Sequence, residues 1–133
     1  MNKEFVPYEQ ALALKELGFD ERCNGHYWEG LFYYQTTHSH PSTMPNSIES
    51  CSAPLYQQAF RWFREKYKLI GLIQRDITRN YNGWWFKILS QIEEKDNPIV
   101  LYSEDFNKDT HEEAELACLN KLIEIIKQEI EKL

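Results

Sequence analysis

The sequence contains no long run of apolar residues, and it has only three cysteines among 133 residues. We therefore expect no membrane-spanning helix, and the charged start Met1-Asn2-Lys3-Glu4 predicts no signal peptide. Three cysteines cannot all pair within one chain. Without an export signal, a reducing interior is the simpler environment, so we expect free thiols and a cytoplasmic protein.

The common catalytic motifs are also missing. There is no glycine-rich phosphate loop, no His-Glu-x-x-His pair and no Gly-x-Ser-x-Gly turn. His111 with Glu112 and Glu115 could be an acid and base pair, but a helix start already explains these carboxylates. We therefore expect a protein that is not an enzyme and that has no cofactor.

What is present is a composition typical of a globular protein, with 42% hydrophobic and 14% aromatic residues. A chain of this length can bury one sizeable core, so we expect a single domain over residues 1–133. The net charge of −6 disfavours general attraction to nucleic acid or to an anionic membrane. Residues 53–103 differ, because they carry eight basic and five acidic groups, a balance of +3.

The first half of the chain predicts a helix, a hairpin and a loop. Pro7 suits the first turn of a helix and Gly18 suits its end, which places the helix at Pro7 to Leu17. Aromatic residues crowd on both sides of Glu29-Gly30, a pattern typical of a hairpin between Cys23 and Thr36. Residues 37–52 are rich in serine and proline and predict a long flexible loop.

The middle of the chain predicts a second helix and a second hairpin. Ser52 can cap the helix, with Pro54 in its first turn. If Asn82-Gly83 is a two-residue turn, counting outward places Ile77 opposite Ile88 and makes one hairpin face strongly apolar. The other face then holds side chains that include Trp85, Lys87 and Leu89.

The last part predicts a strand and a long helix. Residues 99–102 extend the hairpin, and Thr110 with Glu113 forms a capping box at the helix start. The helix has two adjoining apolar stripes, which form either one wide core face or one core stripe and one partner stripe. The predicted fold is α+β, with three helices on one face of a mainly antiparallel sheet of about five strands, in the order α-β-β-α-β-β-β-α.

Binding to another protein, or to a second copy, is the function that these features favour. The hairpin face with Trp85, Lys87 and Leu89 has no obvious cover, and an exposed apolar surface is typical of an interface. A single-stranded nucleic acid is the alternative partner, bound through Arg61, Arg64 and neighbouring basic and aromatic residues of the middle segment.

A zinc site is the third hypothesis. Five side chains that can ligate zinc occur within thirty residues: Cys23, His26, His38, His40 and Cys51. Their spacing is not that of a zinc finger, because the pairs are not separated by a defined interval. Buried cysteines and surface histidines in a loop explain the same residues without a metal.

Three segments together carry a resemblance: Val6–Asp20 (VPYEQALALKELGFD), Ser52–Tyr67 (SAPLYQQAFRWFREKY) and Glu112–Leu119 (EEAELACL). They resemble small uncharacterised proteins encoded by phages and integrated elements of Bacteroides and related gut bacteria. The resemblance covers the three predicted helices, under half of the chain. It implies an accessory role in a phage or mobile element, and no reaction, cofactor or catalytic residue.

Overall fold

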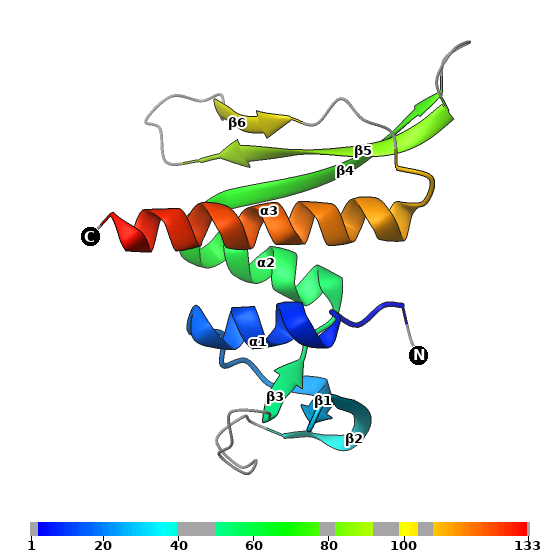
Figure 1. The fold of residues 1–133 in the computed structure, drawn as a ribbon, viewed down its shortest axis with the longest axis vertical. Helices are drawn as coiled ribbons and strands as arrows, with labels where there is room; N and C mark the ends of the chain where they lie inside the picture. The colour runs from blue at the N-terminus through cyan, green and yellow to red at the C-terminus, as the bar shows by residue number, and fades with distance from the viewer. Residues whose placement is uncertain (1–2, 40–49, 78–81, 92–98, 104–107, 133) are drawn as a thin grey trace. The chain divides into compact units, whose positions relative to one another are not determined.

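The computed structural model describes residues 3–39, 50–77, 82–91, 99–103 and 108–132 (Figure 1). Contacts within the chain define two compact units, Met1–Ala59 and Phe60–Leu133. Both units combine helices with an antiparallel sheet of three strands. The fold is therefore α+β, as predicted, but its six strands form two sheets and follow the order α-β-β-β-α-β-β-β-α.

The first unit begins with helix α1 (Tyr8–Glu16), which the sequence predicts correctly. Pro7 precedes the helix, and the chain leaves it at Gly18, whose φ of 101° is a left-handed conformation that glycine adopts without strain. Gly18 N–H donates to the Lys15 carbonyl (3.0 Å) and Phe19 N–H donates to the Leu14 carbonyl (2.9 Å). These two bonds satisfy carbonyls at the helix end in a Schellman motif.

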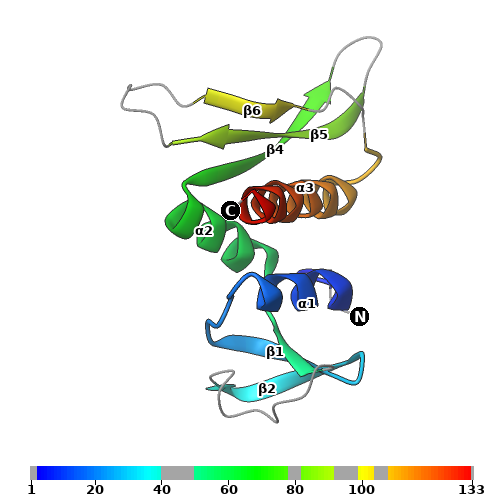
Figure 2. The same ribbon diagram turned by 60° about the vertical axis from the view of Figure 1, so that its left-hand side comes forward.

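The sheet of the first unit has the strand order β2-β1-β3 (Figure 2). Strands β1 (Cys23–Trp28) and β2 (Leu31–Ser39) form the predicted hairpin. Its turn residues Glu29 (φ 52°) and Gly30 (φ 81°) both have the positive φ that a type I′ turn requires. Strand β3 (Ser50–Ala53) is the strand that the sequence prediction omits.

The sequence predicts a loop over residues 37–52, and this prediction is wrong at both ends of the segment. Residues 37–39 complete β2, and residues 50–52 belong to β3, which pairs with β1. Both ends are in strands because their backbone groups find partners in β1, a pairing between distant residues that local composition does not reveal. Residues 40–49 lie outside the described residues.

The second helix also begins later than predicted. Helix α2 covers Tyr56–Tyr67, because Ser52 pairs with His26 in the β1–β3 ladder and cannot cap a helix there. The N-terminal segment holds the helix entrance instead: Val6 N–H donates to the Pro54 carbonyl (2.8 Å), and Tyr56 N–H donates to the Glu4 carbonyl (3.0 Å). The helix then continues from the first unit into the second.

The sheet of the second unit consists of β4 (Leu69–Ile77), β5 (Asn82–Ser90) and β6 (Ile99–Ser103), in the order β4-β5-β6. The expected register is wrong, because Ile77 pairs with Asn82 and not with Ile88. Asn82 and Gly83 begin β5, and the connection falls in residues 78–81, which are outside the described residues. The shift is six residues, an even number, so every side chain keeps its predicted face.

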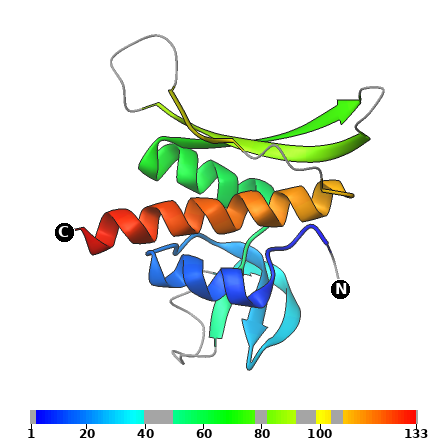
Figure 3. The same ribbon diagram turned by 45° about the horizontal axis from the view of Figure 1, so that its top comes forward.

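Helix α3 (His111–Glu131) covers one face of this sheet (Figure 3). Phe86 and Ile88 of β5 are buried on this face, which we call the inner face. Both apolar stripes of α3 include buried residues, as the interpretation of one wide core face requires; they are Ala114, Cys118, Leu119, Leu122, Ile123 and Ile126. No described helix is both long and apolar enough to cross a membrane.

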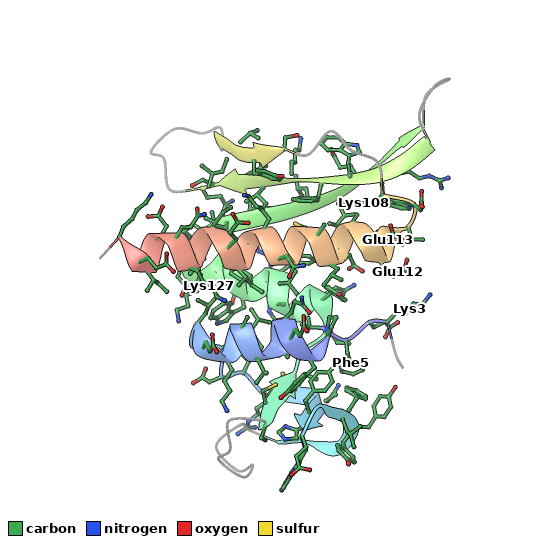
Figure 4. The ribbon with its side chains drawn as sticks, in the orientation of Figure 1. Lys3, Phe5, Lys108, Glu112, Glu113 and Lys127 are labelled. Carbon is green, nitrogen blue, oxygen red and sulfur yellow. The ribbon has the colours of Figure 1, made fainter. Side chains whose placement is uncertain are left out.

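The start of α3 confirms Thr110 as the cap. Glu113 N–H donates to Thr110 Oγ1 (3.1 Å), while Glu113 Oε2 accepts from Asp109 N–H (3.3 Å), one residue before the partner that a standard capping box uses. Glu112 and Glu113 lie in the first turn, close after Lys108 (Figure 4). Acidic groups there complement the positive end of the helix dipole.

Candidate functional site

The predicted partner-binding residues of β5 lie on the sheet face opposite the inner face. Trp85 pairs with Gln74, Lys87 with Leu72, and Leu89 with Ile70. Paired residues share a face, and successive residues of a strand alternate between faces. We call this surface the outer face. Its described members include Ile70, Leu72, Gln74, Trp85, Lys87, Leu89 and, from β6, Val100 and Ser103.

The outer face is largely apolar, and no described helix of the second unit covers it. In the described part of the second unit, both helical segments lie on the inner side of the sheet (Figures 1 and 3). Val100 is 52% exposed, and the β4 and β5 members are half-buried. Lys87 Nζ lies 5.9 Å from the centroid of the Trp85 ring, a cation–π contact. The sheet therefore presents one large aromatic ring among aliphatic side chains.

Arg61 and Arg64 do not belong to this surface. Both are exposed on α2, whose Phe60 ring approaches Gly71 from the inner side of the sheet. Arg75 also lies on the inner side, since it pairs with Trp84, and its guanidinium is 5.6 Å from the Trp84 ring centroid. The described residues therefore do not unite Arg61, Arg64 and Arg75 with Trp85 on one surface, and Lys87 is the basic residue that lies beside this ring.

Of the candidate zinc ligands in the first unit, Cys23 lies near Cys51, but His26 does not join them. His26 pairs with Ser52 and Cys51 pairs with Tyr27 in neighbouring rungs of the β1–β3 ladder, so His26 and Cys51 point to opposite faces. The His38 side chain and His40 lie outside the described residues. Within the described part of the chain, no three His, Cys, Asp or Glu side chains form a group that could hold a metal ion.

The three thiols are poor metal ligands and poor nucleophiles in these buried environments. Burial raises the pKa of Cys23 to about 12, of Cys51 to about 11 and of Cys118 to about 12. All three are free and buried. Since the thiolate is the form that binds metal and attacks electrophiles, these cysteines act here as small apolar side chains.

His26 is the most unusual polar residue of the first unit. It is buried, its Nε2 lies 2.9 Å from Ser50 Oγ, and its Nδ1 has no hydrogen-bond partner among the residues that the structure describes. Lys15 Nζ donates to the Ser50 carbonyl (2.8 Å), which places a positive charge near the ring. Burial lowers the pKa of His26, and Lys15 lowers it further, so the neutral imidazole is favoured.

His111 and Glu115 form a pair on α3 that connects the helix to the sheet. His111 Nδ1 is 3.3 Å from Glu115 Oε1, and the His111 ring packs edge-on against Trp84 at a centroid distance of 4.9 Å. Burial raises the pKa of the Glu115 carboxyl, and the facing His111 opposes that rise. These contacts indicate that the pair packs the first turns of α3 against the sheet.

The structure reveals a second apolar surface that the sequence analysis does not single out. The first hairpin exposes Trp28, Leu31, Tyr33 and Tyr34 to solvent. The aromatic pattern around Glu29-Gly30 indicates the hairpin correctly. It does not indicate which side chains stay uncovered, because that depends on the packing of distant segments.

Comparisons with family models, with curated proteins and with solved structures give no match. The functional interpretation therefore depends on the chain's own surfaces.

Proposed function

We propose that this chain is a non-enzymatic protein that binds another protein through the outer face. The observation that supports the proposal is the apolar array on the outer face, Ile70, Leu72, Trp85, Leu89 and Val100, over which no described helix of the unit lies. Contiguous apolar surface of this kind is typical of an interaction site.

Trp85 and Leu89 are the residues expected to dominate the binding energy. Tryptophan is enriched among interface residues whose truncation weakens binding most, because it buries a large area with few rotatable bonds. Leu89 packs opposite Ile70 and next to Val100, so a partner would cover all three together. Complete burial of a leucine side chain contributes about 1.5–3 kcal/mol. Lys87 adds a positive charge that selects partners with an acidic group at the matching place.

The biological setting is part of the same proposal. The resemblance of the helices to proteins of phages and integrated elements of Bacteroides supports an accessory role in such an element. The three free, buried cysteines fit the cytoplasm of a bacterial host. The partner is then a host protein, or a second protein of the element.

A comparison of variants in affinity capture tests the proposal. Full-length wild type, Trp85→Ala and Leu89→Asp are immobilised and exposed to host lysate, and captured proteins are identified by mass spectrometry. Gln57→Asp is the matched control, because it adds the same charge at an exposed position of α2. We expect a protein that wild type and Gln57→Asp retain and that both outer-face variants lose, with circular dichroism confirming that all four are folded. Equal capture by Leu89→Asp, or no specific capture by wild type, would refute the proposal.

A further inference from the structure

Lys87 lies at the centre of the outer face, among apolar side chains. It belongs to β5, the middle strand of the order β4-β5-β6, and it pairs with Leu72 on one side and with Ser103 on the other. Trp85 and Leu89 flank it along the strand on the same face. A protein that covers both Trp85 and Leu89 must therefore cover Lys87 as well.

The Lys87 ammonium has an aromatic neighbour but no acidic partner in the described part of the chain. Its Nζ lies 5.9 Å from the centroid of the Trp85 ring, so the charge stays within the apolar array. Among the described residues, no carboxylate forms an ion pair with it. A charge that a partner covers loses its water, and buried charges in proteins are paired with an opposite charge. A partner that covers this array must therefore bring a carboxylate to Lys87.

The dimensions of the array fit a single helix. Neighbouring strands lie about 4.8 Å apart, so three strands span about 10 Å, close to the diameter of a helix with its side chains. From Trp85 to Leu89 the strand rises about 13 Å, which is the length of about nine helical residues. On the inner face, α3 contacts both β4 and β5, which shows that one helix can cover this sheet.

An added strand or a second copy fits this sheet less well. Strand β4 carries Arg75 and Asp76 at one edge, and β6 at the other edge has five residues and a register irregularity against β5. Charges, short length and irregularity hinder the addition of a strand. A second copy stacked on the same array about a two-fold axis would bring two Lys87 ammonium groups together, and like charges repel.

We propose that the outer face binds an amphipathic helix of a partner protein, and that this helix carries an acidic residue opposite Lys87. The proposal rests on the proposed function and specifies the kind of partner for the same surface. Apolar residues of the helix at steps of three and four residues cover Trp85 and Leu89. A glutamate or aspartate within that stripe pairs with the Lys87 ammonium beside the Trp85 ring.

A display library of helical peptides tests this proposal without the natural partner. The peptides have about four turns, an apolar stripe and one randomised position at the centre of that stripe. They are selected on the full-length protein after peptides that bind Leu89→Asp have been removed. We expect the retained peptides to carry Glu or Asp at the randomised position. Selection on Lys87→Glu should retain Lys or Arg there instead.

Fluorescence anisotropy with one selected peptide measures the size of the charge effect. Replacing the acidic residue of the peptide with lysine should raise its dissociation constant for wild type about tenfold or more, and Lys87→Glu should recover most of that loss. Lys127→Glu is the control, because it makes the same change in net charge at an exposed position of α3, and it should bind as wild type does. Circular dichroism shows whether each variant is folded.

Several results would overturn the proposal. These are the absence of any retained peptide, retained peptides without an acidic residue at the randomised position, or the same charge preference in Lys87→Glu as in wild type. Analytical ultracentrifugation supplies a further result of this kind. Self-association of wild type that Leu89→Asp abolishes would show that a second copy covers the outer face, in place of a helix from another protein.

The natural partner separates this proposal from the proposed function. We expect Lys87→Glu to lose the lysate protein that Leu89→Asp loses, and Lys127→Glu to keep it. If Lys87→Glu still captures that protein, the proposed function stands and the acidic helix is wrong. If wild type captures nothing, the proposed function fails, while the peptide selection still decides whether the outer face accepts an acidic helix.

Discussion

Gly71 and Cys118 approach so closely that a Cβ atom at residue 71 would lie 2.7 Å from the Cys118 sulfur. Leu122 and Phe60 border the same position at 3.4 and 3.5 Å. The absence of a side chain on β4 therefore lets α3 pack directly on the sheet. We expect Gly71→Ala to destabilise the protein by about 1–3 kcal/mol, the usual cost of overpacking a core.

A double-mutant cycle checks the cause. Cys118→Ala removes the sulfur that the new methyl group meets, so its combination with Gly71→Ala should cost less than the sum of the single changes. Urea denaturation of the four proteins gives the coupling energy. Additive effects would show that the two residues do not share the contact.

Phe86 and Leu89 of β5 should differ sharply in their contribution to stability. Phe86 is buried on the inner face, and Phe86→Ala should cost about 3–5 kcal/mol, the range for removing a buried aromatic ring. Leu89 is half-buried on the outer face, and its truncation leaves no enclosed cavity. We expect Leu89→Ala to cost less than half as much in chemical denaturation. The opposite ranking would show that the faces are assigned incorrectly.

Thr110 should contribute measurably to the stability of α3. Its hydroxyl accepts from the Glu113 amide, one of the donors that a helix start leaves unsatisfied. Thr110→Ala should lower the free energy of unfolding by about 1 kcal/mol, whereas Thr110→Ser, which keeps the acceptor, should be close to neutral. Thermal and urea unfolding of both variants provide the measurement, and equal loss in the two would exclude the capping bond as the reason.

His26 should make stability depend on pH near neutrality. Burial and Lys15 lower its pKa in the folded state, so the unfolded chain binds the proton more readily, with a pKa of about 6.5. The contribution of His26 to the free energy of unfolding is then fully present above about pH 6.5, and it decreases as the pH falls from there through the folded pKa. Urea denaturation between pH 5 and 8 should show this slope in wild type and a smaller slope in His26→Gln. An unchanged slope would assign the dependence to other groups.

Local signals in the sequence predict the elements that local interactions stabilise. Gly18 ends α1, Thr110 starts α3, and the turn at Glu29-Gly30 forms as expected. In each case the residues that satisfy the backbone are neighbours along the chain. Helices α1 and α3 and the first hairpin could therefore be located without knowledge of tertiary structure.

The elements that were predicted incorrectly depend on distant partners. Ser52 is an acceptable helix cap, but its strand pairing with His26 prevails. Asn82-Gly83 is the strongest hairpin signal in the chain, yet the fold uses both residues in β5. The observed register brings Gly71 opposite Ile88, where α3 packs. Packing between elements outweighs the preference of the dipeptide.

The candidate surface was predictable in part for the same reason. Trp85, Lys87 and Leu89 share a face by alternation alone, so their grouping needs no register. Their neighbours Ile70 and Val100 follow only from the observed strand pairing. The exposed hairpin residues could not be identified, because exposure depends on what the remainder of the chain covers.

The alternation of β5 also sets which changes in chain length this fold can tolerate. A deletion of two residues between 78 and 81 would leave Phe86 beneath α3 and Trp85 on the outer face. A deletion of one residue within β5 ahead of Trp85 would exchange them, and would bring the ammonium of Lys87 against the apolar side of α3 where Phe86 now lies. Homologous chains should therefore vary freely in the connection before β5 and keep the residue count of the strand itself.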